Sequence, residues 1–241
     1  MVKILFRNVF RKSFLMAAVL IASAASLSAQ SFSDRMSEKT GRKVRFGFKI
    51  DPGASFLNPQ EAGVTRNSGR FYFSYGVLAD WFIDDEERYA LATGVQVTHF
   101  GSVMQYETGK GLSDFRSASS EYDIRLQYIE VPVALKLKTA TAKGFDFYGQ
   151  FGGFVGMPIR ARANVISNMQ RFDKLGVLRQ IQPFTAGMLL GAGVEYPLTE
   201  TLTGVVGINY QNNFVDITRN GKWNDGRVTG NSFILRLGVY F

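Results

Sequence analysis

Apolar and polar side chains alternate with a period of two along the end of the chain. Residues 232–241 place one apolar set on a single parity: Phe233, Leu235, Leu237, Val239 and Phe241. A period of two is the pattern of a β-strand with one apolar face. The chain stops in mid-strand on an aromatic ring, and a closed barrel, whose last strand pairs with its first, is the arrangement that leaves no open sheet edge.

The same alternation predicts seven further strands. They cover residues 44–54, 71–83, 89–100, 122–138, 145–157, 184–196 and 201–212. The clearest alternation sets Ile129, Val131, Val133, Leu135 and Leu137 against polar or small neighbours. Most of these segments are close to the length of a tilted membrane strand, about 9–11 residues.

Long and short connections alternate between these strands. The long ones cover residues 58–69, 105–120, 158–183 and 213–231, and the short ones cover 84–88, 139–144 and 197–200. This asymmetry is typical of outer-membrane barrels, which have short periplasmic turns and long outward loops. The pattern therefore predicts an all-β fold, an eight-stranded antiparallel up-and-down transmembrane β-barrel.

Aromatic residues fall at the strand ends, where the two interfacial girdles of such a barrel would lie. Beside the short turns they are Trp81, Tyr89, Tyr196 and Phe241, and beside the long loops they are Phe71, Phe100, Phe184, Tyr210 and Phe233.

The first residues read as a secretory signal. A basic segment containing Lys3, Arg7, Arg11 and Lys12 precedes an apolar run at residues 14–25, and small residues follow. That run is too short for a spanning helix. We predict a signal peptide at residues 1–29, a periplasmic segment at 30–43 and the barrel domain at 44–241.

The net charge of +8 overstates the basicity of the exported part. Removing the four basic residues of the signal leaves 28 − 4 = 24 basic against 20 acidic residues, or +4. We therefore expect no nucleic-acid partner. The absence of Cys removes disulfides and thiolate chemistry, and no residues have metal-ligand spacing, so we expect no metal or other cofactor.

The inner parity of the predicted strands carries charges of both signs. An eight-stranded barrel is just wide enough to be filled by side chains, and buried charges must be paired. We therefore predict a polar network in which Glu130 and Glu195 pair with some of Lys49, Lys136 and Arg236. A conducting pore is the alternative, but pores generally need more strands.

Two segments resemble known proteins. The terminal strand resembles that of bacterial outer-membrane β-barrels, which implies insertion by the barrel-assembly machinery through Phe233, Leu235, Leu237, Val239 and Phe241. The run at residues 128–136, YIEVPVALK, resembles a strand of the PorT-like small barrels of Bacteroidota. Its Pro132 lacks a ladder donor, so we expect a bulge or local break there.

The resemblance implies an integral protein of the cell outer membrane and fixes no activity. Our first hypothesis is a structural or binding role through the outward loops, in contact with outer-membrane lipid, lipopolysaccharide or other envelope proteins. The name-giving members of the PorT-like group take part in type IX protein secretion, so a component of a secretion machinery is the alternative.

The longest loop is strongly basic. It carries Arg160, Arg162, Arg171, Lys174 and Arg179 against one acid, Asp173. One interpretation is contact with lipopolysaccharide phosphates or an acidic partner. The other, which the sequence favours, is a solvated basic loop with a short helix around residues 165–175.

An enzyme that modifies lipid A is the least favoured reading. His99, the one histidine, lies three residues from Ser102 along a strand, and this odd spacing puts the two side chains on opposite faces. An isolated His lacks the oriented triad of nucleophilic catalysis. We therefore expect a non-enzymatic protein in which His99 lies in an interfacial girdle.

Overall fold

The computed structural model describes residues 44–139 and 144–241. The predicted signal peptide at residues 1–29, the periplasmic segment at 30–43 and the centre of the turn at 139–144 lie outside this part. No helix among the described residues is long and apolar enough to span a membrane.

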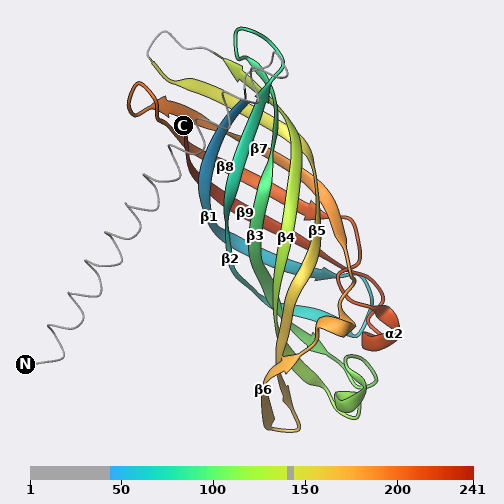
Figure 1. The fold of residues 1–241 in the computed structure, drawn as a ribbon. Helices are drawn as coiled ribbons and strands as arrows, with labels where there is room; N and C mark the ends of the chain where they lie inside the picture. The colour runs from blue at the N-terminus through green and yellow to red at the C-terminus, as the bar shows by residue number, and fades with distance from the viewer. Residues whose placement is uncertain (1–43, 140–143) are drawn as a thin grey trace, which may run out of the picture.

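Eight of the described strands form a closed antiparallel ring (Figure 1). In ring order they are β1 (Val44–Pro59), β2 (Val64–Phe82), β3 (Tyr89–Tyr106), β4 (Ser120–Thr139), β5 (Asp146–Ser167), β7 (Thr185–Pro197), β8 (Thr203–Asn213) and β9 (Val228–Tyr240). The last strand pairs with the first, for example Phe48 with Val239. The predicted eight-stranded up-and-down barrel is confirmed.

The two faces of the wall follow the predicted parity. Along β4 every even-numbered residue from Ser120 to Lys136 is buried, whereas Ile129, Val131, Val133 and Leu137 are exposed on the outside. A contiguous apolar outer face of this kind is what a lipid-facing barrel wall requires.

The strands extend farther outward than the sequence predicted. The segment at residues 58–69 is mostly strand, because β1 ends at Pro59 and β2 begins at Val64. Figure 1 shows the strands continuing at the end of the barrel away from the C-terminus. Most outward side chains there are polar, while inward ones such as Leu57 and Tyr106 are fully buried. The predicted boundaries were wrong on this side because the ladder continues beyond the hydrocarbon, where the outer face is no longer apolar.

The predicted long loop at residues 158–183 contains a β-hairpin. The ninth strand, β6 (Gln170–Gly176), pairs with the outer end of β5. Asn168 and Met169 join them with positive φ values of 50° and 61°, the backbone geometry of a tight two-residue hairpin turn. The predicted helix around residues 165–175 is therefore wrong.

An apolar cap closes the outward end of the barrel. Trp223 is fully buried at the end of α2 (Asn220–Trp223), and its ring centroid lies 5.6 Å from that of Tyr106 and 5.2 Å from that of Tyr122. Two short 3₁₀ helices lie in other connections at this end: η1 (Ser113–Phe115) between β3 and β4, and η2 (Leu178–Gln180) between β6 and β7. Phe100, predicted for the outer girdle, lies inside the barrel and packs on Tyr128 at 5.2 Å. That assignment was wrong because Phe100 shares the inner parity of Thr98.

Pro132 interrupts one ladder, as expected. Between β3 and β4 the pairs Thr93–Val133 and Gln96–Glu130 are formed, but the two pairs between them are missing, with the register unchanged. The hydroxyl of Thr93 donates to the Pro132 carbonyl at 2.8 Å. The bulge itself lies elsewhere, at Ile159 of β5, opposite Gln127 and Tyr128.

Candidate binding groove on the outer wall

The outer face of β4 and β5 changes from apolar to charged near the outward end of the barrel. On β4 the outward residues pass from Ile129 to Gln127 and Arg125, and on β5 they pass from Ile159 to Arg160 and Arg162. Such a change marks the upper limit of the hydrocarbon region.

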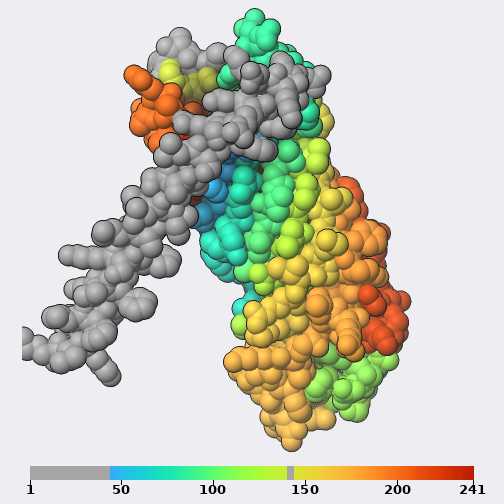
Figure 2. Space-filling view, in the orientation of Figure 1, coloured from blue at the N-terminus to red at the C-terminus, as the bar shows by residue number. Residues whose placement is uncertain are grey.

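A cavity of about 340 Å³ lies at this boundary, on the wall that faces the viewer in Figure 2. We call it the basic groove. Its lining residues are Arg70, Phe71, His99, Phe100, Arg125, Leu126, Gln127, Arg160, Arg162, Asn164 and Lys174. The groove therefore brings together five cationic side chains from β2, β4, β5 and β6.

The strand register places some of these cations side by side. Arg125 is the direct partner of Arg162, and Gln127 is the partner of Arg160. Directly opposite residues of an antiparallel pair have Cβ atoms about 4.5–5.5 Å apart, and like charges in this arrangement are destabilising. The fold thus holds two guanidinium groups where a shared anion would relieve their repulsion.

One carboxylate partly neutralises the groove. Asp123 forms an ion pair with Arg70 and another with Arg125, at 2.8 Å from Nη2, and Asn164 donates to it at 3.4 Å. Within the described ranges, none of the ion pairs includes Arg160, Arg162 or Lys174. These three cations face solvent with their charge available to a ligand.

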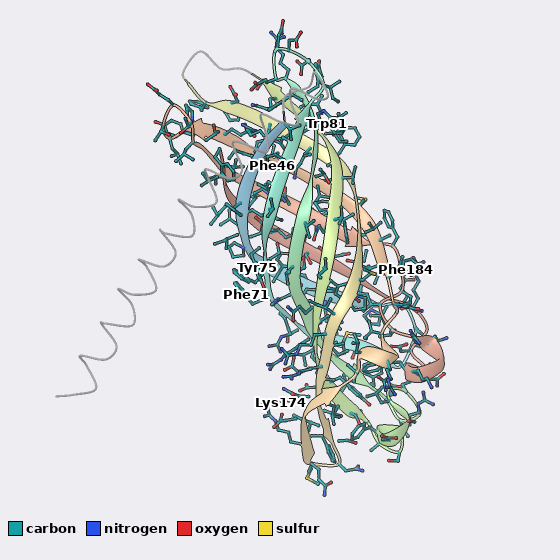
Figure 3. All side chains as sticks on the ribbon, viewed as in Figure 1. Phe46, Phe71, Tyr75, Trp81, Lys174 and Phe184 are labelled. Atoms are coloured by element: carbon teal, nitrogen blue, oxygen red, sulfur yellow. The ribbon has the colours of Figure 1, made fainter. Side chains whose placement is uncertain are left out.

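The backbone of β6 positions Lys174. Its φ is 58°, within a bulge of the β5–β6 ladder, and its N–H donates to the side-chain oxygen of Asn164 at 2.8 Å. A positive φ at a non-glycine residue is uncommon and is maintained here by this local hydrogen bond. Lys174 is thereby set beyond Phe71 along the barrel (Figure 3).

An aromatic surface continues from the groove towards the hydrocarbon. Phe71, Phe73 and Tyr75 follow one another on the outer face of β2, with ring centroids 6.4 Å and 6.0 Å apart. His99 on β3 lies 6.4 Å from Phe73 and 6.1 Å from Tyr75. We call these four rings the aromatic ladder, and Figure 3 shows its members Phe71 and Tyr75 on the barrel wall.

The described part of the lumen contains two ion clusters. Lys136 pairs with Asp80 at 2.8 Å and with Glu195. Arg45 also pairs with both carboxylates, at 2.8 Å from Asp80 and 3.0 Å from Glu195. A second cluster joins Lys49 to Asp51, with Arg236 at 3.5 Å from Asp51. Apart from the partly exposed Arg45, these side chains are buried on the inner parity.

Glu130 departs from the predicted pairing. Its carboxylate accepts hydrogen bonds from Gln96 and Thr98, each at 2.7 Å, and not from a basic side chain. The reason is local, since Lys49 is two residues from Asp51 on the same face of β1 and pairs with it. The apolar cap and these clusters place buried side chains along the lumen.

Comparison with known proteins identifies the fold family. The family model described as "Outer membrane protein beta-barrel domain" matches residues 28–219. The chain belongs to this family. As a member of the outer membrane β-barrel domain family, it is an outer-membrane protein. No curated protein matches the chain.

Solved structures similar to this family member are small barrels of low sequence identity. Neisserial surface protein A is 16% identical, with a TM-score of 0.44, over 81% of this chain and 97% of its own. Ail of Yersinia pestis is 14% identical, with a TM-score of 0.34, over 82% of this chain and 98% of its own. OprG of Pseudomonas aeruginosa is 12% identical, with a TM-score of 0.40, over 82% of this chain and 92% of its own.

The β-barrel wall keeps His99 apart from Ser102. His99 lies on the outer face among the rings of the aromatic ladder, whereas Ser102 is buried and donates to the Ser68 carbonyl. Among the described residues no group of three or more His, Cys, Asp or Glu side chains is placed to hold a metal ion.

The terminal strand of this family member has the predicted exposure. Phe233, Leu235, Leu237 and Val239 lie on the outer face of β9. Phe241 follows the strand, its N–H donates to the Phe46 carbonyl at 2.9 Å, and its ring lies 5.5 Å from that of Phe48. Their recognition by the barrel-assembly machinery stays a prediction.

Three of the five predicted basic residues line the groove, namely Arg160, Arg162 and Lys174. Arg171 instead pairs with Asp173 at 2.8 Å, and Arg179 lies in η2. Sequence reasoning missed Arg70 and Arg125. The signal was present for Arg125, because it shares the outward parity of Ile129 and Val131.

Proposed function

We propose that this protein is a closed outer-membrane β-barrel that binds an anionic ligand in the basic groove on its outer wall. The observation that supports this most directly is the register of β4 and β5, which sets Arg125 beside Arg162 with Arg160 one position away. A protein that only needed a soluble outer surface would gain stability by placing opposite charges at these positions.

The groove suits a phosphate-bearing ligand better than a carboxylate. Guanidinium groups form bidentate hydrogen bonds to phosphate oxygens, and three cations without an ion pair offer several donors to one tetrahedral group. Because the groove is partly open to solvent, its attraction should weaken as salt screens it.

Binding of a soluble polyanion tests this proposal. The full barrel in detergent is titrated with inorganic tripolyphosphate at low and high salt. We expect saturable binding at low salt, weakened about tenfold or more when Arg160 and Arg162 are both replaced by Gln. The matched control, Arg171→Gln with Arg179→Gln, removes the same charge from β6 and η2, outside the lining of the groove, and should bind as the wild type does.

Equal loss of binding in the two double variants would contradict the proposal, since it would show that net charge alone attracts the anion. Both variants are first checked for the shift in gel mobility on heating that folded barrels give.

A role in a secretion machinery is a second candidate. It is supported by the PorT-like run at residues 128–136, with its interruption at Pro132. In this proposal the barrel, exported by residues 1–29 and inserted through its terminal strand, docks with other envelope proteins. Gentle detergent extraction followed by co-purification tests it, and a barrel that runs alone would argue against it.

A further inference from the structure

We propose that the ligand of the basic groove is the lipid A part of lipopolysaccharide, with a phosphate held by the groove cations and an acyl chain lying on the aromatic ladder. This inference rests on the proposed function and adds the identity of the ligand. The groove and the aromatic ladder together require one ligand that has an anionic headgroup and, on the side facing the hydrocarbon, an apolar part.

The groove and the aromatic ladder form one continuous surface. Phe71 and His99 line the groove, and both belong to the ladder. The ring centroid of Phe73 lies 6.4 Å from that of Phe71 and 6.0 Å from that of Tyr75. A ligand that fills the groove therefore contacts aromatic rings at the edge of the groove that faces the hydrocarbon.

The height of the groove matches a lipid headgroup of the outer leaflet. Directly towards the hydrocarbon from Arg160, β5 presents Ile159 and Met157, which are exposed and apolar. Phe71, 70% exposed, stands at the same boundary on β2. A soluble anion would use only the cations and would make no contact with these apolar side chains.

The cations are arranged for one phosphate. Arg125 and Arg162 are direct register partners, and Lys174 is tied by its backbone to Asn164, two residues from Arg162 on the same face. Two residues along a strand span about 6.5 Å, so Arg160 stands one row nearer the hydrocarbon, where it meets the sugar or the edge of the phosphate.

The test compares three probes on the full barrel in nanodiscs of a neutral phospholipid. The probes are lipid A, lipid A with its phosphates removed, and inorganic tripolyphosphate. Two variant sets are compared, Phe71→Leu with Tyr75→Leu in the aromatic ladder, and Arg160→Gln with Arg162→Gln in the groove. The control is Phe184→Leu, an exposed girdle ring just before β7, seen at the other edge of the barrel in Figure 3.

We expect lipid A to bind more tightly than either other probe. The ladder variant should weaken lipid A binding about threefold or more and leave tripolyphosphate binding unchanged. The groove variant should weaken both, about tenfold for lipid A, and Phe184→Leu should change neither.

Two outcomes overturn the inference in different ways. If tripolyphosphate binds as tightly as lipid A and the ladder variant has no effect, the groove binds a soluble anion, and the proposed function stands without this ligand. If dephosphorylated lipid A binds as tightly as lipid A, or no probe binds, the anion-binding function fails as well.

Discussion

At the residue scale, the carboxylate of Glu195 lies against three basic side chains in the lumen. Lys136 and Arg45 pair with it, the latter at 3.0 Å, and Lys138 lies 3.1 Å away. Asp80 is the other carboxylate of this cluster. Removing one partner of a buried ion network leaves charge uncompensated, which costs more than the network itself contributes.

Glu195→Gln should therefore destabilise the barrel by about 3 kcal/mol. The measurement is urea-dependent unfolding of the protein in lipid vesicles. Glu200→Gln, in the exposed turn that follows β7, serves as the control and should leave the free energy of unfolding within about 0.5 kcal/mol of wild type. A Glu195 variant as stable as this control would mean that the lumen is hydrated and the ion pairs contribute little.

A different carboxylate, Asp225, lies in the outward cap beyond the membrane. It is fully buried and accepts hydrogen bonds from the hydroxyls of Tyr106 at 3.0 Å and Thr218 at 3.1 Å. Burial raises the pKa of Asp225 to about 6, and the nearby charge of Asp216 adds to the increase. The positive charge of Arg227 acts in the opposite direction on the pKa of Asp216, which burial raises.

This raised pKa makes the cap more stable in acid. The folded state holds the proton more tightly than the unfolded state, so the stabilisation is complete below the ordinary pKa and is lost as pH rises through about 6. Between pH ~7.5 and ~5 the opening free energy of residues 214–227 should rise by about 1 kcal/mol. Hydrogen exchange, corrected for its intrinsic pH dependence, measures it. Asp225→Asn should remove most of the effect, and an unchanged pH dependence in that variant would assign it to another group.

At the element scale, β4 shows how much a period-two pattern specifies. Its alternation alone predicted which side chains from residue 129 to 137 face lipid, because a single apolar face imposes one register. The outward ends of the strands were not predictable in this way. Above the hydrocarbon the outer residues are mostly polar, so the predicted strands at 44–54 and 71–83 stopped short, whereas β1 ends at Pro59 and β2 begins at Val64.

The β5–β6 hairpin shows a second limit. Its turn, Asn168-Met169, contains no glycine, and β6 has too few apolar residues for a periodic signal. Arg70 and Arg125 join the groove through pairings between distant strands, which the sequence of one strand does not contain. The number of strands and the lipid-facing parity were therefore predictable, and the composition of the groove was not.

The lipid-facing side of β4 gives a direct prediction. Val133 is 48% exposed on the outer face, so Val133→Arg should cost about 2–4 kcal/mol in membrane stability if it lies near the bilayer midplane. Gln127→Arg, six residues along on the same face but at the polar boundary, should cost only about 0–1 kcal/mol. Refolding into vesicles measures both, and equal costs would show that the two positions see the same environment.

At the scale of the whole molecule, buried side chains line the interior of the barrel, and the proposed binding surface lies on its outer wall. The apolar cap around Trp223 occupies the outward end of the lumen, and the ion clusters lie farther from that end. The groove and the aromatic ladder lie on the outer wall of β2 to β6. This division assigns stability to the interior and binding to the exterior.

The filled interior predicts a non-conducting protein. In planar lipid bilayers the purified barrel should give no steady ohmic openings, because an eight-stranded barrel is only wide enough to hold its own side chains. Replacing Trp223 by Ala should loosen the cap and leave the ion clusters in place, so this variant should not conduct either. Stable single-channel steps from the wild-type protein would contradict a closed interior.

The central prediction is that lipid A occupies the outer wall of the barrel in the native membrane. Native mass spectrometry of the barrel, extracted from outer membranes in mild detergent, measures this directly. We predict that the wild type and the Arg171→Gln, Arg179→Gln variant each retain one lipid A molecule, and that the Arg160→Gln, Arg162→Gln variant does not. Equal retention by all three proteins, or no lipid A on any of them, would contradict the account.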